Sequence, residues 1–207
     1  DLKSAAEDLG ITSYRFSLAW SRIEPEMGVF NEDAIQHYNE VIDACLENGI
    51  EPMITLHHFS HPLWFEEMGS FEREENIDIF LRFSEKVFRA YSDRVKYWCT
   101  HNECGPFATM GWGLGVFPPG VKSIRRMGAV LLNLMRSHTK VYHHLKALPN
   151  GQDVQIGLVK NIFQFDPWHR WNPIHWYICR FIDEVYNESI IRTIRDGHFK
   201  ITSRPFI

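Results

Sequence analysis

The sequence predicts an α/β protein whose parallel sheet forms part of a (β/α)8 barrel. Four segments with the apolar or alternating pattern of strands are each followed by a stretch with helical periodicity. Successive strands begin about forty residues apart, which is the spacing of strand–helix units with long loops. A complete eight-stranded barrel takes about 250 residues, so a chain of 207 residues accounts for about four units. We therefore expect a single partial barrel domain over residues 1–207.

The first strand–helix pair begins after a short helix expected over residues 2–9. Residues 11–18 alternate apolar and polar side chains, which is the period of a strand with one buried face. Arg15 lies on the polar side of that pattern. The following helix is expected over residues 32–48, where apolar residues recur at helical spacing and Asn31 can act as the N-terminal cap.

The next two strand–helix pairs repeat this order. A strand over residues 51–56 leads into a loop rich in histidine, and a helix is expected over residues 72–91. A third strand over residues 95–100 is followed by a glycine- and proline-rich loop over residues 111–120 and by a helix over residues 124–148. Both strand–helix pairs extend the same parallel sheet.

The last part of the chain holds one more strand and one more helix. Residues 154–159 have the composition of a strand, and Asn161 stands just beyond it. An aromatic loop is expected over residues 163–176, before a final helix through residues 185–194 that Gly197 ends. No internal repeat and no flexible linker divides the chain.

Composition is typical of a globular protein with a small or neutral ligand. Hydrophobic residues make up 44% of the chain, which is enough for a sizeable core. The net charge is -4 without any basic stripe, and no apolar run reaches the ~18 residues of a membrane span, so we expect no nucleic-acid and no membrane partner. The cysteines form no CxxC pair, which favours a reducing compartment and a cytoplasmic location. They are Cys45, Cys99, Cys104 and Cys179.

A carboxylate stands just after the third predicted strand. Glu103 follows Asn102 at this point, and Gly105 and Pro106 then turn the chain away. In barrels and open α/β sheets the ligand lies at the carboxyl ends of the parallel strands. Most glutamates are solvated surface groups, but one at this position is a better candidate for an acid or base than one on a helix face. We predict that Glu103 is catalytic.

Three histidines after the second strand raise the alternative of a metal site. His57, His58 and His61 could serve a metal-dependent barrel hydrolase, which loss of activity on chelation would support. Neighbouring residues of an extended segment point to opposite faces, however, and no carboxylate at HExxH spacing accompanies these histidines. We therefore expect no metal and no cofactor.

A series of short motifs runs along nearly the whole chain. In order they are Tyr14-Arg15-Phe16-Ser17, Trp20-Ser21-Arg22-Ile23, Thr55-Leu56-His57-His58 with Pro62, Thr100-His101-Asn102-Glu103, Gly111 through Pro118-Pro119-Gly120, Asn133-Leu134 with His138, and Ile156-Gly157 before Asn161. This series resembles the glycoside hydrolases of family one, the β-glucosidase type, in which the motifs occur in the same order.

The resemblance implies a (β/α)8 TIM barrel that hydrolyses β-linked glycosides or oligosaccharides with retention of configuration. It implies that Glu103 is the general acid/base and that Asn102 and His58 bind hydroxyls of the non-reducing sugar. It also implies that Arg15 supports the site by holding the nucleophile ionised, and that Asn161 is a further supporting residue.

Two departures from the family pattern bear on the activity. The residue after the acid/base is usually proline in the family and is Cys104 here. The family's nucleophilic glutamate lies on the seventh strand, and no residue of this chain matches it. Retaining cleavage needs two carboxyl groups about 5–5.5 Å apart, so we expect this chain alone to be inactive and to lack the C-terminal part of the barrel. A separate C-terminal half and a second copy of the chain are the partners left open.

Several alternatives remain open at this point. A non-catalytic sugar-binding or regulatory relative is the alternative function, and neither the preferred sugar nor the acceptance of a 6-phosphate follows from the sequence. Asn102 can instead cap a turn, His58 can be a structural histidine, and His138 is expected to be a core histidine. The tryptophans of the aromatic loop can stack on a sugar or form a small satellite core. They are Trp168, Trp171 and Trp176.

Overall fold

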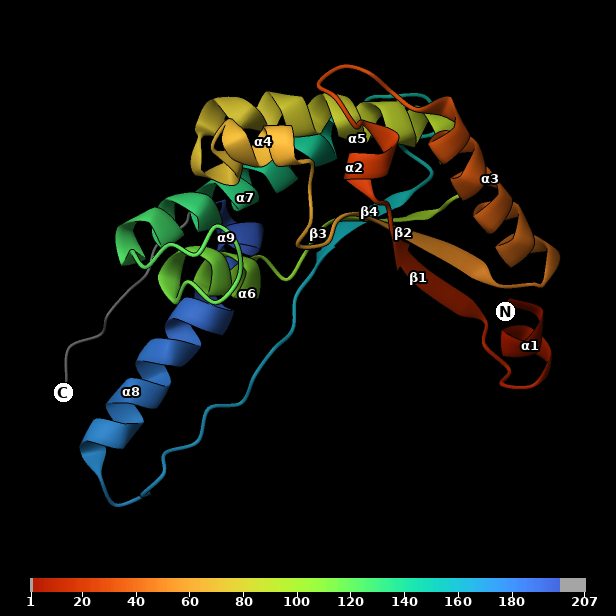
Figure 1. Cartoon of the computed structure of the whole chain (residues 1–207). Coiled ribbons are helices and arrows are strands. Elements are labelled where there is room, and N and C mark those ends of the chain that lie inside the picture. The colour runs from red at the N-terminus through yellow and green to blue at the C-terminus, as the bar shows by residue number, and fades with distance from the viewer. Residues whose placement is uncertain (1, 198–207) are drawn as a thin grey trace. The chain divides into compact units, whose positions relative to one another are not determined.

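The computed structural model describes residues 2–197, and these divide into two compact units. Residues 2–159 hold the sheet together with the helices that cover it, and residues 160–197 form a mainly helical unit (Figure 1). The expectation of one domain over residues 1–207 stays a prediction.

The four strands form one parallel sheet in sequence order, as predicted. Their bounds are Ser13–Ser17 for β1, Glu51–His57 for β2, Tyr97–Asn102 for β3 and Gln155–Val159 for β4. All four predicted strands are confirmed, with ends that differ by at most about two residues. Because neighbouring strands are consecutive in the chain, one crossover joins each pair, which is the arrangement of a barrel wall.

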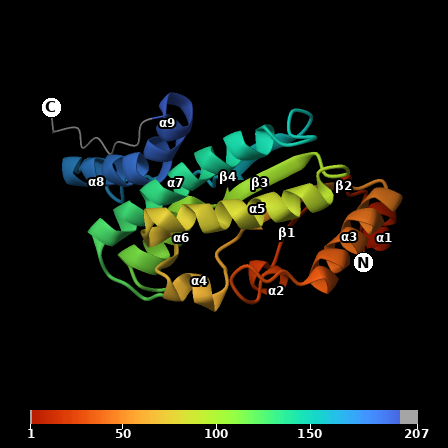
Figure 2. The ribbon, with the colours of Figure 1, turned by 90° about the horizontal axis from the view of Figure 1, so that it is seen from above.

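Three long helices cover one face of the sheet. They are α3 (Glu32–Glu47), α5 (Ile77–Tyr91) and α7 (Ile124–Lys146), whereas the short α1 (Leu2–Glu7) precedes β1. Figures 1 and 2 show the three long helices on the same side of the strands. Crossovers between parallel strands turn in one hand, so their helices collect on one face. Within the first unit, the opposite side of the sheet carries no such helix and is called the bare face below.

The core of the first unit lies between the sheet and these helices. Trp98 of β3 is buried against Phe88 of α5, with ring centroids 4.9 Å apart. Trp20 and Phe83 stack in the same layer at 4.8 Å. Each buried aromatic side chain removes about 150–250 Å² from water, so these rings dominate the apolar burial that holds the helices to the sheet.

A buried carboxylate fastens the loop after β1 to α5. The Glu24 side chain is 0% exposed and accepts hydrogen bonds from the Trp20 indole N–H (2.8 Å) and the Gly28 backbone N–H (2.7 Å). It also pairs with the Arg82 guanidinium of α5. A buried charge is stable only with partners of this kind, so the loop takes one fixed path.

Short helical elements fill the loops at the carboxyl ends of the strands. They are α2 (Trp20–Ile23), α4 (Leu63–Glu67), the 3-10 turns η1 (Ser70–Glu72) and η2 (Glu74–Asn76), α6 (Cys104–Ala108) and the π-helical turn η3 (Thr109–Gly113). Segments this short contain too few residues to show a helical period. The helix predicted from residue 72 therefore begins only at Ile77, and the loop predicted over residues 111–120 begins inside a π-helical turn.

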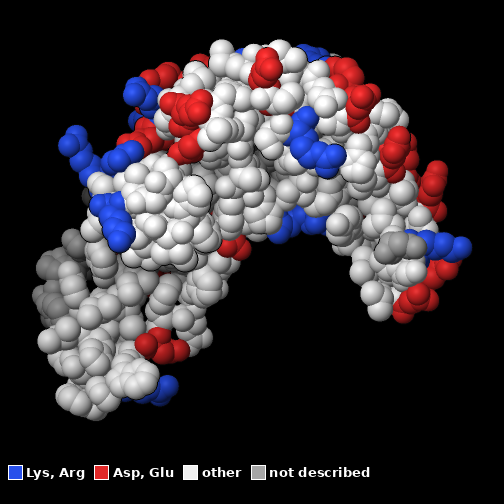
Figure 3. Space-filling model, in the orientation of Figure 1, with Lys and Arg blue, Asp and Glu red and all other residues white. Residues whose placement is uncertain are grey.

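Charged side chains gather on the outer side of the helices, where Figure 3 shows acidic and basic groups interspersed. Arg136 of α7 pairs with Glu74 at 2.5 Å, and Lys140 of α7 pairs with Asp78 of α5. All four side chains are about half exposed or more, and such pairs contribute roughly 0–1 kcal/mol each. The outer side of this helical layer is therefore a solvated surface.

The second unit is a nearly continuous helical run. It consists of α8 (Pro173–Asp183), the π-helical turn η4 (Glu184–Glu188) and α9 (Ser189–Asp196). The helix predicted through residues 185–194 thus begins earlier than expected, and the loop predicted over residues 163–176 is wrong in its last residues. Pro173 in the first turn and the Asn172 side chain as cap form a helix start that the aromatic composition obscured. Among the described residues, no helix has the length and apolar character needed to cross a membrane.

The tryptophans before and within α8 do not form a core. Trp168 is 86% exposed and Trp171 is 79% exposed, so the satellite-core interpretation is wrong for both. Trp176 belongs to α8, and its indole N–H donates to the Arg170 carbonyl oxygen at 2.8 Å. Stacking of these rings on a sugar stays a prediction.

Candidate active site

Alternation along β1 places two polar side chains on the bare face of the sheet. Phe16 points to the helical side and stacks on Tyr38 of α3, with ring centroids 6.2 Å apart. Successive side chains of a strand alternate, so Arg15 and Ser17 face the other way. Nη1 of Arg15 donates a hydrogen bond to Oγ1 of Thr55 on β2 at 3.1 Å. The Arg15 guanidinium makes no ion pair with any carboxylate within residues 2–197.

β3 contains one extra residue opposite β4, between Cys99 and Asn102. Cys99 pairs with Gly157 and Asn102 pairs with Val159, so three residue steps of β3 lie opposite two of β4. Such a β-bulge shifts the alternation of the side chains beyond it. Asn102 thereby faces the bare side, where its Oδ1 accepts a hydrogen bond from Nη1 of Arg15 at 3.0 Å.

The two residues inside this bulge both face the helices. Oγ1 of Thr100 lies 2.8 Å from Nδ1 of His138, and Nε2 of His101 lies 3.1 Å from Oγ of Ser137. Both partners belong to α7, whereas strict alternation would send Thr100 and His101 to opposite faces. Burial lowers the pKa of His101 to about 3 and that of His138 to about 4, so both rings are neutral core groups near pH 7.

Two adjacent histidines at the end of β2 face opposite directions. His57 is buried on the helical side against Phe71 and Phe107, with both ring centroids 5.0 Å away. Burial, reinforced by the neighbouring histidines, holds the pKa of His57 well below its usual value. His58 turns to the bare face, where its Nδ1 lies 2.7 Å from Oγ of Ser17.

The three histidines after β2 therefore do not converge. Nδ1 of His61 lies 3.3 Å from Nε2 of His57, and Nε2 of His61 lies 2.7 Å from a Glu66 carboxylate oxygen. His57 and His61 thus share one structural network, and His58 lies on the other side of the strand. Among residues 2–197, no three His, Cys, Asp or Glu side chains are arranged to hold a metal ion.

His58 lies within the electrostatic reach of two other predicted site residues. Burial lowers the pKa of His58, the Arg15 cation lowers it further, and the Glu103 carboxylate acts in the opposite direction. The imidazole is therefore neutral near pH 7. Its Nε2 has no hydrogen-bond partner within residues 2–197, which leaves this nitrogen available to a ligand.

Glu103 stands at the carboxyl end of β3 with an unusual backbone. Its φ of 44° and ψ of 65° lie in the left-handed region, and its backbone N–H donates to the Val159 carbonyl oxygen of β4 at 2.9 Å. The side chain is half-buried, and its carboxylate makes no hydrogen bond or ion pair within residues 2–197. Strained backbone at a functional site is a recurrent observation. The backbone of Glu103 is thus fixed to β4, and its carboxylate is available to a ligand.

Asn161 follows the end of β4 by two residues and belongs to the second unit. Its Oδ1 is buried and has no hydrogen-bond partner among the described residues. A buried amide oxygen without a partner is uncommon in folded proteins. Its supporting role stays a prediction.

Two polar side chains hold the predicted site residues, although the sequence assigned neither of them a role in the site. Ser17 contacts His58, and Thr55 contacts Arg15. The signal for Ser17 was present, since it shares the polar side of the β1 alternation with Arg15. Thr55 belongs to the motif series, but its contact with Arg15 was not predictable, because a side-chain contact between two strands depends on their register.

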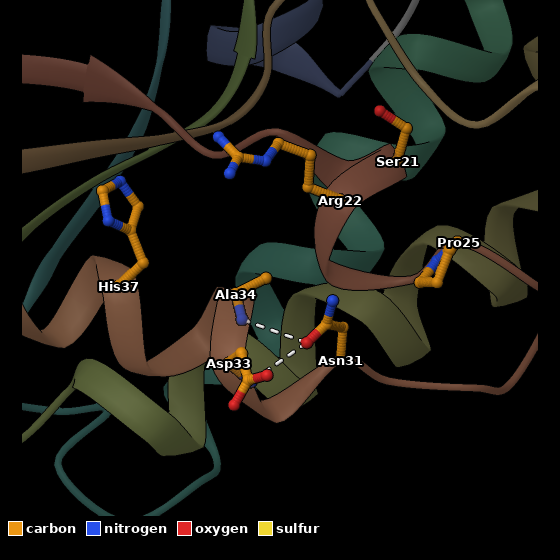
Figure 4. Close-up of a pocket in the computed structure, with 7 residues that line it drawn as sticks. All are labelled: Ser21, Arg22, Pro25, Asn31, Asp33, Ala34 and His37. Carbon is orange, nitrogen blue, oxygen red and sulfur yellow. Dashed lines mark hydrogen bonds between the residues drawn. The ribbon is translucent and has the colours of Figure 1, made fainter.

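A surface pocket lies apart from these residues, between α2 and the first half of α3 (Figure 4). Its lining consists of Ser21, Arg22, Pro25, Asn31, Asp33, Ala34 and His37. Figure 4 shows the Asn31 side chain turned back onto the first turn of α3, where it accepts two backbone hydrogen bonds. None of the predicted site residues lines this pocket.

Comparison with known proteins connects this geometry to a family. The model of the family described as "Glycosyl hydrolase family 1" matches residues 1–177. The chain is 38% identical over 151 residues to the cytosolic beta-glucosidase of Homo sapiens, a match that covers 72% of this chain and 32% of that protein. It is also 38% identical over 164 residues to the 6-phospho-beta-galactosidase of Clostridium acetobutylicum, covering 78% of this chain and 34% of the relative.

Solved structures agree with this match. The beta-glycosidase from Pyrococcus horikoshii superposes with a TM-score of 0.89 at 34% identity, over 99% of this chain and 47% of that one. The fold is therefore that of a (β/α)8 barrel, of which the described residues hold four parallel strands. The chain spans about a third of the length of the two curated relatives and about half of this structure.

Proposed function

The chain belongs to glycosyl hydrolase family 1, and on that premise we propose that it forms the acid/base side of a β-glycosidase that cleaves O-glycosidic bonds with retention. One observation carries this proposal. Glu103 is a half-buried carboxylate at the carboxyl end of a barrel strand, without a partner in the described residues and close enough to His58 to influence its pKa. This is the position at which barrel enzymes place their reacting groups.

The reaction assigns Glu103 the role of general acid in its first step and of general base in its second. Cleavage of a glycoside develops positive charge on the sugar and negative charge on the leaving oxygen, so a carboxylic acid must protonate that oxygen. In the second step the same group, now ionised, takes a proton from the attacking water. The nucleophilic carboxylate of the first step is assigned to a later strand of the barrel, because no residue of this chain matches it.

The side chains around Glu103 suit the recognition of sugar hydroxyls. Nη1 of Arg15 donates to Oδ1 of Asn102, and the amide N–H groups of Asn102 have no partner within residues 2–197, so they remain to donate to a sugar oxygen. His58 offers Nε2 from the neighbouring strand end. Arg15 and Asn161 are proposed to support the site, Arg15 by fixing the Asn102 amide and by adding positive charge beside the nucleophile.

The location and the partners of the protein are proposals of the same kind. The four thiols and the cytosolic relative of Homo sapiens support a cytoplasmic location. The proposed protein partners are a C-terminal half of the barrel, which would complete the site, or a second copy of this chain. The substrate is proposed to be a β-linked glycoside or oligosaccharide.

Replacement of Glu103 by Ala tests the acid/base role, in a polypeptide that continues this chain through the rest of the barrel. An alkyl glycoside needs protonation of its leaving group, so its glycosylation rate should fall by about 10²–10⁴-fold. A dinitrophenyl glycoside already has a good leaving group, so its glycosylation should fall far less. Added azide should restore turnover of the dinitrophenyl glycoside and give a β-glycosyl azide, because this anion needs no general base.

The matched control is Glu67→Ala, which removes an exposed glutamate of α4. This variant should hydrolyse both substrates like the unmutated protein. A Glu103→Ala variant that is equally impaired on both glycosides and unaffected by azide would show that Glu103 only binds or positions the sugar.

A further inference from the structure

Ser17 contacts a proposed sugar ligand from the neighbouring strand. Its Oγ lies 2.7 Å from Nδ1 of His58, a distance typical of a strong hydrogen bond. We propose that Ser17 is a positioning residue that fixes the ring of His58 so that Nε2 meets one hydroxyl of the bound sugar. This inference rests on the proposed function, because it assigns a task to a residue that acts through His58.

Ser17 is better anchored than the histidine that it holds. It is the last residue of β1 and pairs with Thr55 of β2, and the next backbone N–H, of Leu18, donates to the Thr55 carbonyl oxygen at 3.0 Å. His58 lies one residue beyond β2, and Phe59 then takes a left-handed φ of 66° as the chain leaves the sheet. A histidine at the start of a loop needs an external contact to hold one ring orientation.

The hydrogen bond of Ser17 determines which ring nitrogen remains. The two nitrogens of an imidazole point in different directions, and a ring flip exchanges their places. With Nδ1 engaged by Ser17, only Nε2 remains for a ligand, and it has no partner within residues 2–197. The ring is neutral near pH 7, so the contact at Nδ1 also influences which nitrogen carries the proton.

The charges around His58 make this orientation matter for chemistry. Arg15 faces the same side of the sheet as Ser17 and donates to Asn102. Glu103 lies near enough to affect the pKa of His58. A ring turned by 180° would offer a different atom to this polar surface, so a sugar hydroxyl would lose its contact with Nε2 although the histidine is still present.

Kinetics on a set of monodeoxy aryl glycosides test the inference, in a polypeptide that continues this chain through the rest of the barrel. Ser17→Ala should lower kcat/KM for the parent glycoside by roughly three- to tenfold, the loss expected when one hydrogen bond of a binding group is weakened. For one member of the deoxy set, the one that lacks the hydroxyl bound by His58, Ser17→Ala should no longer lower kcat/KM. The same deoxy glycoside should also be the one on which His58→Ala has no effect, because both substitutions act through one contact.

Two variants make the experiment specific. Ser17→Thr keeps the hydroxyl and should restore most of kcat/KM, whereas Ser13→Ala removes a serine from the same side of β1 and should change nothing. A Ser17→Ala loss of equal size on every deoxy glycoside would overturn the proposal, because it would indicate a merely structural role.

Nitrogen-15 spectra of the histidine rings in the 207-residue chain separate this inference from the proposed function. With Ser17 present, the His58 nitrogens should show one dominant neutral tautomer, and Ser17→Ala should shift them toward a mixture while Ser17→Thr does not. Unchanged His58 resonances in Ser17→Ala would overturn the positioning role. Absence of glycoside hydrolysis by the unmutated enzyme would instead reject the proposed function, and these spectra would still decide the contact.

Discussion

Glu103 carries a strain that a smaller residue would relieve. Its φ of 44° and ψ of 65° bring the Cβ atom close to the neighbouring backbone, a conformation that only glycine adopts freely. We expect Glu103→Gly to be more stable than Glu103→Ala by about 1 kcal/mol, although both variants lack the proposed acid/base. Urea unfolding of the two variants measures this difference. Equal stabilities, or a more stable alanine variant, would mean that the strain at this position is negligible.

A site residue could be predicted from the sequence where the pattern that marks it lies in consecutive residues. The position of Glu103 after a strand and before Gly105 is visible in consecutive residues. The contact of Ser17 with His58 is not, because it joins residues 41 positions apart and depends on the register of two strands. Single residues at strand ends were therefore predictable, and the pairs that hold them were not.

The first turn of α3 depends on one side chain. Oδ1 of Asn31 accepts hydrogen bonds from the backbone N–H groups of Asp33 (3.0 Å) and Ala34 (3.2 Å), which the helix cannot satisfy internally (Figure 4). Asn31→Ala should lower the free energy of unfolding by about 1 kcal/mol, and Asn31→Asp should largely preserve it because aspartate is an equally good cap. Thermal or urea unfolding gives both values. Similar destabilisation by the two substitutions would contradict a capping role and point to the lost Asn31 amide group.

Long helices were predictable and short ones were not. The 23 residues of α7 repeat their apolar face many times, so its bounds were predicted to within a few residues. The π-helical turns η3 and η4 and the 3-10 turns before α5 contain only three to five residues each. Contacts with neighbouring elements decide such segments, and a single sequence does not contain them.

Three buried histidines couple the stability of the first unit to pH. Burial lowers the pKa of His57, of His101 (to about 3) and of His138 (to about 4), whereas all three titrate near 6.5 in the unfolded chain. Below about pH 6.5 the unfolded state therefore binds protons that the folded state does not. Stability is lost as the pH falls from about 6.5 toward 4, with a limiting slope of about 1.4 kcal/mol per pH unit for each histidine.

Replacement of His138 measures how much this one histidine contributes to the pH dependence of the unfolding free energy. Gln can keep a hydrogen bond to Oγ1 of Thr100 but cannot take up a proton in the unfolded state. Between pH 6 and 5, the unfolding free energy of His138→Gln should therefore fall less steeply than that of the unmutated protein, by about 1 kcal/mol per pH unit. The groups that face this ring are Thr100 and His101 of β3, and Tyr142 and His143 of its own helix. Parallel stability curves for the two proteins would show that His138 protonates equally in the folded and unfolded states.

The extra residue of β3 has a practical consequence for anyone who wishes to move this site into another barrel. Copying only the side chains that a ligand could touch would omit Thr100 and His101, which are turned away from it. In a host strand without the additional residue, the amide of Asn102 would then be presented to the helices instead of to the sugar. The segment from Cys99 to Asn102 has to be transplanted as one cassette, together with a helix that can receive the two hidden side chains.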